Sequence, residues 1–257
     1  DSLGLTCEKI KYLLNDAITR QLVSDVPLCT FLSGGLDSSI ITKFAADYYQ
    51  KEGKELLNTY SIDYVDNDKN FVKSDFQPNS DSYYIDLMSK NLYTKHHSIV
   101  IDTPELATAL EDAMIARDMP GMADIDSSLL LFCKNVKKEM TVALTGECAD
   151  EIFGGYPWFF REDALHSNTF PWSIAITERQ KLLNPSISSK INLKQYIDYR
   201  YQESLNEVEI LETDSTETAE KRKISHLTLN WFMQTLLDRS DRMAMYHGFE
   251  LRVPFCD

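Results

Sequence analysis

Apolar positions near the start of the chain recur at the spacing of an amphipathic helix. They are Ile10, Leu13, Leu14, Ala17 and Ile18. Residues three, four or seven positions apart share one face of a helix. Thr6, just before them, has a hydroxyl that can accept a hydrogen bond from the first turn. The pattern predicts a helix over residues 6–22 with Thr6 as its N-cap.

Short apolar runs and helical patterns then alternate. The runs that we expect to be buried strands are 26–32, 57–62, 97–101 and 141–144. The segments with helical spacing between them are 40–53, 82–93, 103–117 and 127–139. Four such repeats are typical of a parallel sheet that has helices on both faces. The sequence therefore predicts an α/β fold.

The last hundred residues have a different pattern. From about Gly155 onward the strand signal disappears, and residues 216–247 have a long helical pattern. We expect an α/β core over 1–154, followed by a helical portion, 155–257, that packs beside it. Residues 63–81, with five Asp, are expected to form a long loop. The apolar ending suggests that the natural protein continues beyond this chain.

The acidic composition limits what such a fold can bind. The 257 residues include 40 Asp and Glu but only 26 Lys and Arg, so the net charge is −14. Nucleic acids and anionic membranes bind through clusters of Lys and Arg, so neither is expected as a partner. No apolar run approaches the ~20 residues of a membrane span. The five cysteines contain no CxxC pair, which favours a soluble, cytoplasmic protein over a disulfide-linked or zinc-binding one.

The segment LSGGLDSS, residues 32–39, stands between a predicted strand and a predicted helix. Backbone N–H groups and the positive end of the helix converge there, where a phosphate can bind. Two glycines would let the backbone approach the phosphate, three serines could donate hydroxyl groups, and the aspartate suggests an intervening Mg²⁺. A turn that only caps the helix is the alternative, but it needs one glycine and one cap. The candidate phosphate-binding residues are Ser33, Gly34, Gly35, Asp37, Ser38 and Ser39.

A second acidic and glycine-rich segment, TGECADEIFGGY at 145–156, follows the last predicted strand. Loops at the carboxyl ends of parallel strands face a common crevice, so Glu147, Asp150 and Glu151 should face the same crevice as Asp37. Two carboxylates from separate loops suit a Mg²⁺ that bridges to a polyphosphate, and a third, Glu147, could bind substrate or transfer a proton. Taken alone, the segment fits an acidic helix N-terminus equally well.

Three motifs together carry a family resemblance. The segment SGGLDSS resembles the PP-loop of the ATP pyrophosphatases, which have an adenine nucleotide alpha hydrolase-like fold. With TGECADEIFGGY and ELRVPF at 250–255, the whole chain resembles the synthetase domain of glutamine-dependent asparagine synthetases. Cys148 departs from the family pattern, in which a glycine is usual at this position.

The resemblance implies roles for particular residues. Asp37 and Asp150 match positions that hold Mg²⁺ on pyrophosphate. Glu147 matches an acidic residue that handles aspartate and ammonia, and Arg239, in a stretch that looks like the family's DRxxM pattern, matches a basic position near the transferred groups. Both are candidate catalytic residues. Positions around the adenosine half of ATP are matched by Leu32, Ser61 and Gly146.

The implied reaction joins L-aspartate and ammonia to give L-asparagine. ATP first forms β-aspartyl-AMP and pyrophosphate, and ammonia then displaces AMP. Family members carry an N-terminal glutaminase domain that supplies the ammonia and a C-terminal segment with a lysine near the adenylate, and neither is expected within this chain.

The residues alone leave three points open. A related synthetase acting on another carboxylate, of the β-lactam or macrocycle type, is one alternative. A non-catalytic module that binds Mg-ATP is another. Assembly as a homodimer is also undecided by the sequence.

Overall fold

The computed structural model describes residues 2–73, 80–119 and 121–257 of the chain. The chain divides into two compact units, of which the first comprises Asp1–Ala149 and Leu236–Asp257 and the second Asp150–Thr235. The division expected from the sequence, 1–154 and 155–257, therefore differs mainly in residues 236–257, which belong to the first unit.

The first unit is built on a parallel sheet. Among the described residues its strands are β1 (Leu28–Phe31), β2 (Asn58–Tyr64), β3 (Lys95–Ile101), β4 (Val142–Leu144) and β5 (Glu250–Arg252). Their order is β3-β2-β1-β4-β5, and every neighbouring pair is parallel. The predicted α/β fold is confirmed. The order also makes β1 central, with β2 on one side and β4 on the other, so the loops after these strands lie at one edge of the sheet.

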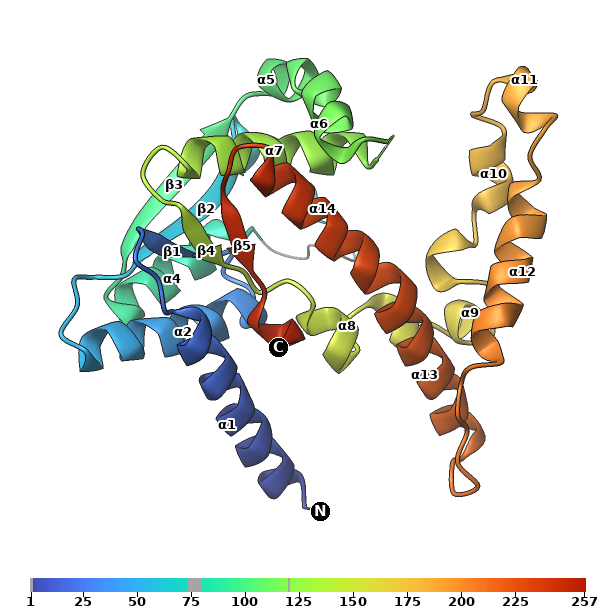
Figure 1. The fold of residues 1–257 in the computed structure, drawn as a ribbon, viewed down its shortest axis with the longest axis horizontal. Coiled ribbons are helices and arrows are strands. Elements are labelled where there is room, and N and C mark those ends of the chain that lie inside the picture. Colours follow the sequence, from blue (N-terminus) through green and yellow to red (C-terminus); the bar gives the residue numbers. More distant parts are fainter. Residues whose placement is uncertain (1, 74–79, 120) are drawn as a thin grey trace. The chain divides into compact units, whose positions relative to one another are not determined.

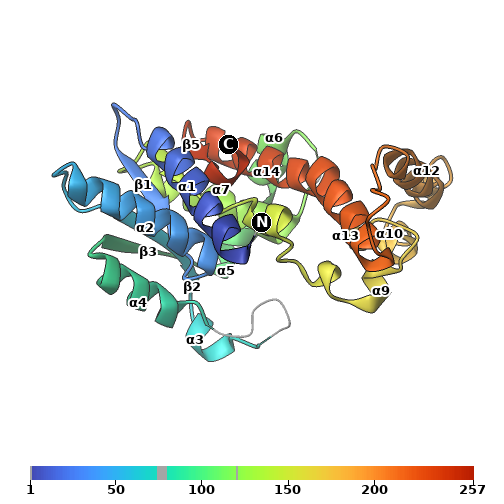
Figure 2. The same cartoon turned by 90° about the horizontal axis from the view of Figure 1, so that it is seen from below.

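Helices cover both faces of this sheet (Figures 1 and 2). On one face lie α1 (Leu3–Gln21), α2 (Leu36–Lys51) and α4 (Ser82–Leu92). On the other lie α5 (Thr103–Thr108), α6 (Leu110–Arg117), α7 (Ala123–Val136) and α14 (Met233–Met245). The short α3 (Asn67–Asn70) follows β2, and η4 (Pro254–Cys256) follows β5.

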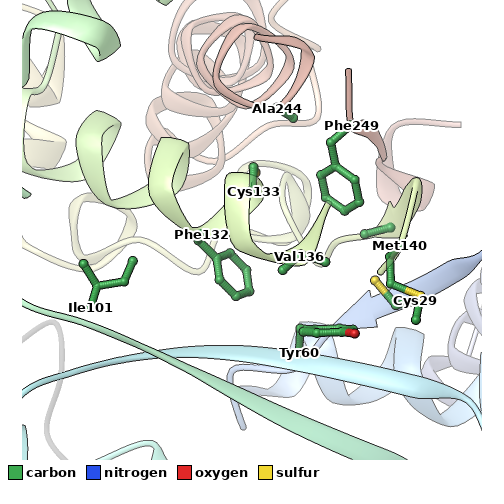
Figure 3. Close-up of a cluster of buried hydrophobic side chains, with 10 residues drawn as sticks. Cys29, Tyr60, Ile101, Phe132, Cys133, Val136, Met140, Ala244 and Phe249 are labelled. Carbon is green, nitrogen blue, oxygen red and sulfur yellow. The ribbon is translucent and has the colours of Figure 1, made fainter. Parts of the chain in front are cut away.

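The main core lies between the sheet and α7. Figure 3 shows Phe132 and Val136 on the side of α7 that faces Tyr60 of β2, while Cys133 points toward Ala244 of α14 and Phe249 lies beside them. Cys133, Val136 and Phe249 have no exposed surface. Removing this much apolar surface from water is the main stabilising term of such a layer. It holds the strands that carry the loops described below.

The second unit is helical. Its first helix, α8 (Ala149–Phe153), begins one residue before the unit does. The elements that follow are η1 (Pro157–Phe159), α9 (Glu162–Leu165), η2 (Pro171–Ser173), α10 (Ile176–Gln180), α11 (Pro185–Ser188), α12 (Leu193–Leu205), α13 (Thr216–Leu227) and the π-helical η3 (Thr228–Phe232). Its core contains Phe170, Tyr201 and Leu227. Trp231 packs against them, and its indole N–H donates to Ser204 Oγ at 2.7 Å.

Several predicted boundaries are corrected by the structure. The first helix begins at Leu3 rather than at residue 6, because the Ser2 side chain accepts from the Leu5 N–H and Thr6 lies inside the helix. The predicted helix 103–117 is two helices, since Ala109 has ψ −3°, far from the helical value of about −42°.

The predicted strand-free region and the predicted long helix are also revised. Glu250–Arg252 forms β5, which pairs with β4. The 216–247 helix is interrupted by the π-helical turn η3. The expected loop 63–81 contains the end of β2 and α3, and its residues 74–79 lie outside the described part of the chain. Within that part, no helix combines the length and apolar character needed to cross a membrane.

Candidate active site

The glycine-rich loop connects β1 to α2 at the carboxyl end of the central strand. Gly34 has φ +79°, in the left-handed region that favours glycine. A Cβ at this position would lie 2.8 Å from Tyr84 Cβ and 2.9 Å from the Ile85 backbone nitrogen. Gly34 therefore lets the loop pack closely against α4.

Serine side chains fix the shape of this loop. Ser38 Oγ accepts from the Ser33 backbone N–H at 3.1 Å and lies 3.0 Å from Ser33 Oγ. It donates to the Gly35 carbonyl at 3.3 Å. Gly35 is the N-cap of α2 and provides no side-chain hydrogen bond, so the positive end of a 16-residue helix faces this loop. Such a helix start favours an anion.

The loop after β4 packs on the first turn of α2. A Cβ on Gly146 would lie 2.8 Å from the Ser38 backbone nitrogen and 3.0 Å from the Asp37 carbonyl carbon. Only a glycine allows this approach without a shift of the backbone. The two sequence motifs therefore meet, as the rule for the carboxyl ends of parallel strands predicts.

The two loops border a cavity of about 380 Å³. The volume lies within the range of about 300–1,000 Å³ typical of small-molecule sites. Its lining residues come from both loops, β1, β2, α2, α4, α7 and α14, and from the segment before α4. They are Phe31, Leu32, Ser33, Gly35, Asp37, Ser38, Tyr60, Ser61, Ile62, Asp81, Ile85, Leu129, Phe132, Thr145, Gly146, Glu147, Arg239 and Ser240.

Most of the residues selected from the sequence line this cavity. Gly34 and Ser39 belong to the same loop and helix, and Asp150 and Glu151 belong to the second unit, but none of the four is among the lining residues. Ser39 Oγ is buried without a hydrogen-bond partner among the described residues. Because Ser39 does not line the cavity, this hydroxyl is not placed to contact a ligand there. The start of α2 and the loop before it do border the cavity, and they suit an anion such as a phosphate.

Glu147 and Arg239 meet in the cavity wall. Arg239 Nη2 lies 2.8 Å from Glu147 Oε1, and both side chains are 15% exposed. Arg239 Nε is buried and has no partner in the described part of the chain. The guanidinium thus retains donor capacity for a carboxylate or phosphate of a ligand.

Ser240 is a site residue that the sequence analysis missed. Its hydroxyl donates to Glu147 Oε2, and the residue is only 2% exposed. The signal was present in α14, whose buried face consists of Leu236, Ser240, Met243 and Ala244. A serine in an otherwise apolar stripe needs a polar partner, which here is Glu147.

Leu32, directly after β1, lies beside Ser61 in the middle of β2. The Leu32 N–H donates to the Tyr60 carbonyl at 2.9 Å, which extends the strand pairing by one residue. Leu32 is fully buried and Ser61 is 6% exposed. Ser61 Oγ lies 3.0 Å from His96 Nε2. His96 was not selected from the sequence, because only the pairing of β2 with β3 brings it next to Ser61.

Asp150 and Glu151 are the first two residues of the second unit. Burial raises the pKa of the Asp150 carboxyl, and a Cβ on Gly155 would overlap its Oδ1. Glu151 is 1% exposed and accepts a hydrogen bond from the Tyr156 hydroxyl at 2.6 Å. This bond gives Glu151 a structural role, and the role of Asp150 as a metal ligand stays a prediction.

Comparison with known proteins gives the site a context. The asparagine synthase family model matches residues 9–257. Over its whole length the chain is 51% identical to asparagine synthetase (glutamine-hydrolyzing) 3 of Bacillus subtilis, and it covers 42% of that protein. It is 27% identical to asparagine synthetase (glutamine-hydrolyzing) 1 of the same organism, over 97% of this chain and 42% of the relative. Amidase chyE of Penicillium rubens is 32% identical over 68% of this chain. The chain thus spans less than half the length of these relatives.

Proposed function

This chain belongs to the asparagine synthase family, and from that premise we propose that it carries out the ATP-dependent amidation of L-aspartate to L-asparagine. The proposed products are AMP and pyrophosphate, formed through β-aspartyl-AMP. The observation that carries the proposal is the cavity in which the SGGLDSS loop, Gly146 and the Glu147–Arg239 pair meet.

The phosphates of ATP are assigned to the loop and to the start of α2. The helix N-terminus, Ser33 and Ser38 would bind the β- and γ-phosphates. Asp37 in this loop, with Asp150 by family resemblance, would hold a Mg²⁺ that neutralises the charge of the leaving pyrophosphate. Leu32, Ser61 and Gly146 would surround the adenosine half.

The chemistry needs positioning and electrostatic stabilisation rather than a protein nucleophile. A β-carboxylate oxygen of aspartate attacks the α-phosphorus, and the bond to pyrophosphate breaks. Arg239, with its unpaired Nε, would bind a negatively charged group near the reacting atoms. Ammonia then attacks the acyl carbon, AMP leaves, and Glu147 would accept the proton that the new amide nitrogen releases.

The full-length relatives are named as glutamine-hydrolyzing enzymes. We propose that ammonia reaches this site from a glutaminase domain of the natural protein. The cytoplasm is the proposed location. A homodimer is the assembly to test, by light scattering coupled to size exclusion.

Aspartate-dependent release of AMP and pyrophosphate by the full-length protein tests the proposal. ATP turnover that is indifferent to aspartate would refute this substrate assignment. Asp37→Asn is expected to abolish binding of ATP in the presence of Mg²⁺. Asp47→Asn is the matched control, because Asp47 lies on the same helix as an exposed partner of Lys43. Equal ATP binding by the two variants would contradict the metal role of Asp37.

A second candidate keeps the adenylation chemistry but uses a different carboxylate. It is favoured by the similarity to amidase chyE over 68% of this chain. Screening carboxylic acids for pyrophosphate release separates the two candidates. Binding of Mg-ATP without turnover of any of them would instead favour a nucleotide-binding module.

A further inference from the structure

A chain of hydrogen bonds runs from the cavity into the layer between the sheet and α4. Ser61 Oγ lies 3.0 Å from His96 Nε2, and His96 Nδ1 lies 2.9 Å from Thr59 Oγ1. Thr59 Oγ1 is 3.3 Å from Thr94 Oγ1, and the Thr94 hydroxyl donates to Ser89 Oγ at 3.2 Å. Of these groups only Ser61 lines the cavity. We call the five residues the serine–histidine relay.

The far end of the relay fixes the direction of every proton in it. Because a hydroxyl has one proton, Thr94, which donates to Ser89, must accept from Thr59. Thr59 has then used its own proton, so it must accept from the Nδ1–H of His96. A neutral imidazole carries one N–H, so Nε2 is an acceptor.

Ser61 is therefore the donor to His96 Nε2. Its only proton points toward His96, which does not line this cavity, so toward the cavity the Ser61 oxygen can offer only lone pairs. Ser61 is thereby restricted to accepting hydrogen bonds from whatever occupies the cavity.

The surroundings of His96 favour the neutral ring that this direction requires. Burial, with a smaller contribution from His97, lowers the pKa of His96, while Asp86 of α4 opposes the shift. Asp63 and Asp81 line a neighbouring cavity of about 360 Å³ together with His96 and Asp86. At neutral pH and above, the lowered pKa keeps the ring uncharged.

We propose that the serine–histidine relay makes Ser61 a selector for the 6-amino group of adenine. An amino group offers an N–H to the lone pairs of Ser61, whereas the 6-keto group of hypoxanthine or guanine brings an acceptor against an acceptor. His96 and Thr59 are positioning residues, which act only through Ser61. The inference rests on the proposed function, because it requires the adenosine half of a nucleotide to lie beside Ser61 in this cavity.

Inosine triphosphate is the matched probe, since it carries a keto group where ATP carries the amino group. A buried polar group that loses its partner costs about 1–3 kcal/mol, which corresponds to roughly 5- to 150-fold in affinity. The full-length protein should therefore bind Mg-ATP at least about tenfold more tightly than Mg-inosine triphosphate near pH 8. Isothermal titration calorimetry measures both dissociation constants directly.

Variants at Thr59 separate positioning from packing. Thr59→Val keeps the shape but leaves the His96 tautomer unconstrained, so the ratio of the two dissociation constants should fall several-fold. Thr59→Ser keeps the hydroxyl and should keep the ratio. Thr30→Val is the control, because Thr30 is an equally buried threonine whose hydroxyl pairs with Thr42 outside the relay.

The wild-type protein provides a second measurement that needs no variant. As the pH falls through the lowered pKa of His96, both ring nitrogens become donors, and Ser61 regains a proton to offer a keto group. The preference for ATP should therefore shrink at low pH.

The outcomes separate this inference from the proposed function. Equal affinity of the wild-type protein for the two nucleotides near pH 8, or an undiminished ratio in Thr59→Val, overturns the relay. A ratio that does not fall with pH also overturns it. Failure of the wild-type protein to bind ATP contradicts the proposed function instead.

Discussion

Cys148 adopts a backbone conformation that suits a glycine better. Its φ is +75°, and its side chain is 2% exposed. For residues with a Cβ the left-handed region costs about 1–2 kcal/mol. The family pattern has a glycine here, and the geometry supplies the physical reason. In this chain the strain is held next to Glu147, within the loop that borders the cavity.

Replacing Cys148 should reveal that strain. Cys148→Gly and Cys148→Ala both remove the thiol, but only glycine relaxes the backbone. We expect the glycine variant to be about 1 kcal/mol more stable than the alanine variant in urea unfolding. An alanine variant at least as stable as the glycine variant would show that the loop stores no such strain.

Ser240 is expected to affect the reaction rate through its hydrogen bond to Glu147. Ser240→Ala removes a hydrogen bond to a carboxylate, an interaction worth about 1.5–3 kcal/mol. We therefore expect kcat for aspartate-dependent pyrophosphate release to fall roughly tenfold to a hundredfold, with little change in the affinity for ATP. The double variant with Glu147→Gln should be no slower than Glu147→Gln alone. Additive losses would indicate that Ser240 acts independently of Glu147.

The residues of local motifs could be predicted from the sequence, and those paired over long distances could not. Gly34 was recognisable because its left-handed backbone conformation, with φ +79°, is a property of a short loop. Ser240 and His96 act through partners 93 and 35 residues away in the chain. Their roles depend on how α14 and β3 are placed, which no local pattern encodes.

At the level of secondary structure, β5 is joined to the start of the fold by one arginine. Arg252 Nη1 donates to the carbonyls of Gln21 and Val23 at 2.5 and 2.8 Å. The first is the carbonyl of the last residue of α1 and the second lies two residues beyond the helix, where a cation is favoured. Arg252 Nε also pairs with Glu250 at 2.6 Å. The arginine of the ELRVPF motif thus has a structural role.

Arg252→Met should therefore lower stability without touching the cavity. Losing charge-assisted bonds to two carbonyls should cost about 2 kcal/mol, measured by urea unfolding. Hydrogen exchange should increase in the last turn of α1. Arg20→Met is the control, because Arg20 on the same helix is exposed and pairs only with Asp16 among the described residues. Equal stability of the two variants would contradict this role.

A pH-dependent contact ties the segment before α13 to that helix. Arg222 Nε and Nη2 lie 2.8 and 3.0 Å from the Asp214 carboxylate, and the Leu211 N–H donates to it at 3.0 Å. The Arg222 hydrogen bond, followed by the Leu211 bond, lowers the pKa of Asp214. A carboxylate with a lowered pKa stabilises the fold above its unfolded pKa, near about 4, and loses that contribution as the pH falls through its folded value.

Asp214→Asn should therefore reduce stability at pH 7 and flatten its decline below about pH 4. Tryptophan fluorescence can report the transition, since Trp158, Trp172 and Trp231 all lie in the second unit. Asp198→Asn, in an exposed pair with Lys194, is the control. A pH profile identical to that of the wild type would contradict the assignment.

Element types were predictable where the pattern was long, and element limits were not. The alternation of apolar runs and helical spacing predicted four strands of the parallel sheet. The fifth strand escaped because it spans three residues, of which only Leu251 is apolar. Its position is set by pairing with β4 rather than by local propensity.

Over the whole molecule, the sequence divides the chain differently from the structure. Residues 236–257 return to the first unit after the helical one. That return supplies Arg239 and Ser240 to the cavity. Pattern alone could not show it, because the helical spacing runs from residue 216 through the unit boundary without a change of composition.

The negative net charge of the molecule affects how the cavity could bind a phosphate. An overall charge of −14 repels a polyphosphate, so a site that is to bind one needs positive groups of its own. The start of α2 and the Arg239 guanidinium are the positive groups at the cavity. Because these act at short range, ATP binding is expected to depend on them far more than on the net charge.

The central claim is that a carboxylate of aspartate attacks the α-phosphorus of ATP. Full-length protein supplied with ammonia, Mg-ATP and aspartate labelled with oxygen-18 in the β-carboxylate tests it directly by mass spectrometry. Attack at the α-phosphorus followed by ammonia at the acyl carbon leaves one labelled oxygen in AMP, and we predict that result together with labelled asparagine. Unlabelled AMP, or ADP and phosphate in its place, would contradict the proposed reaction.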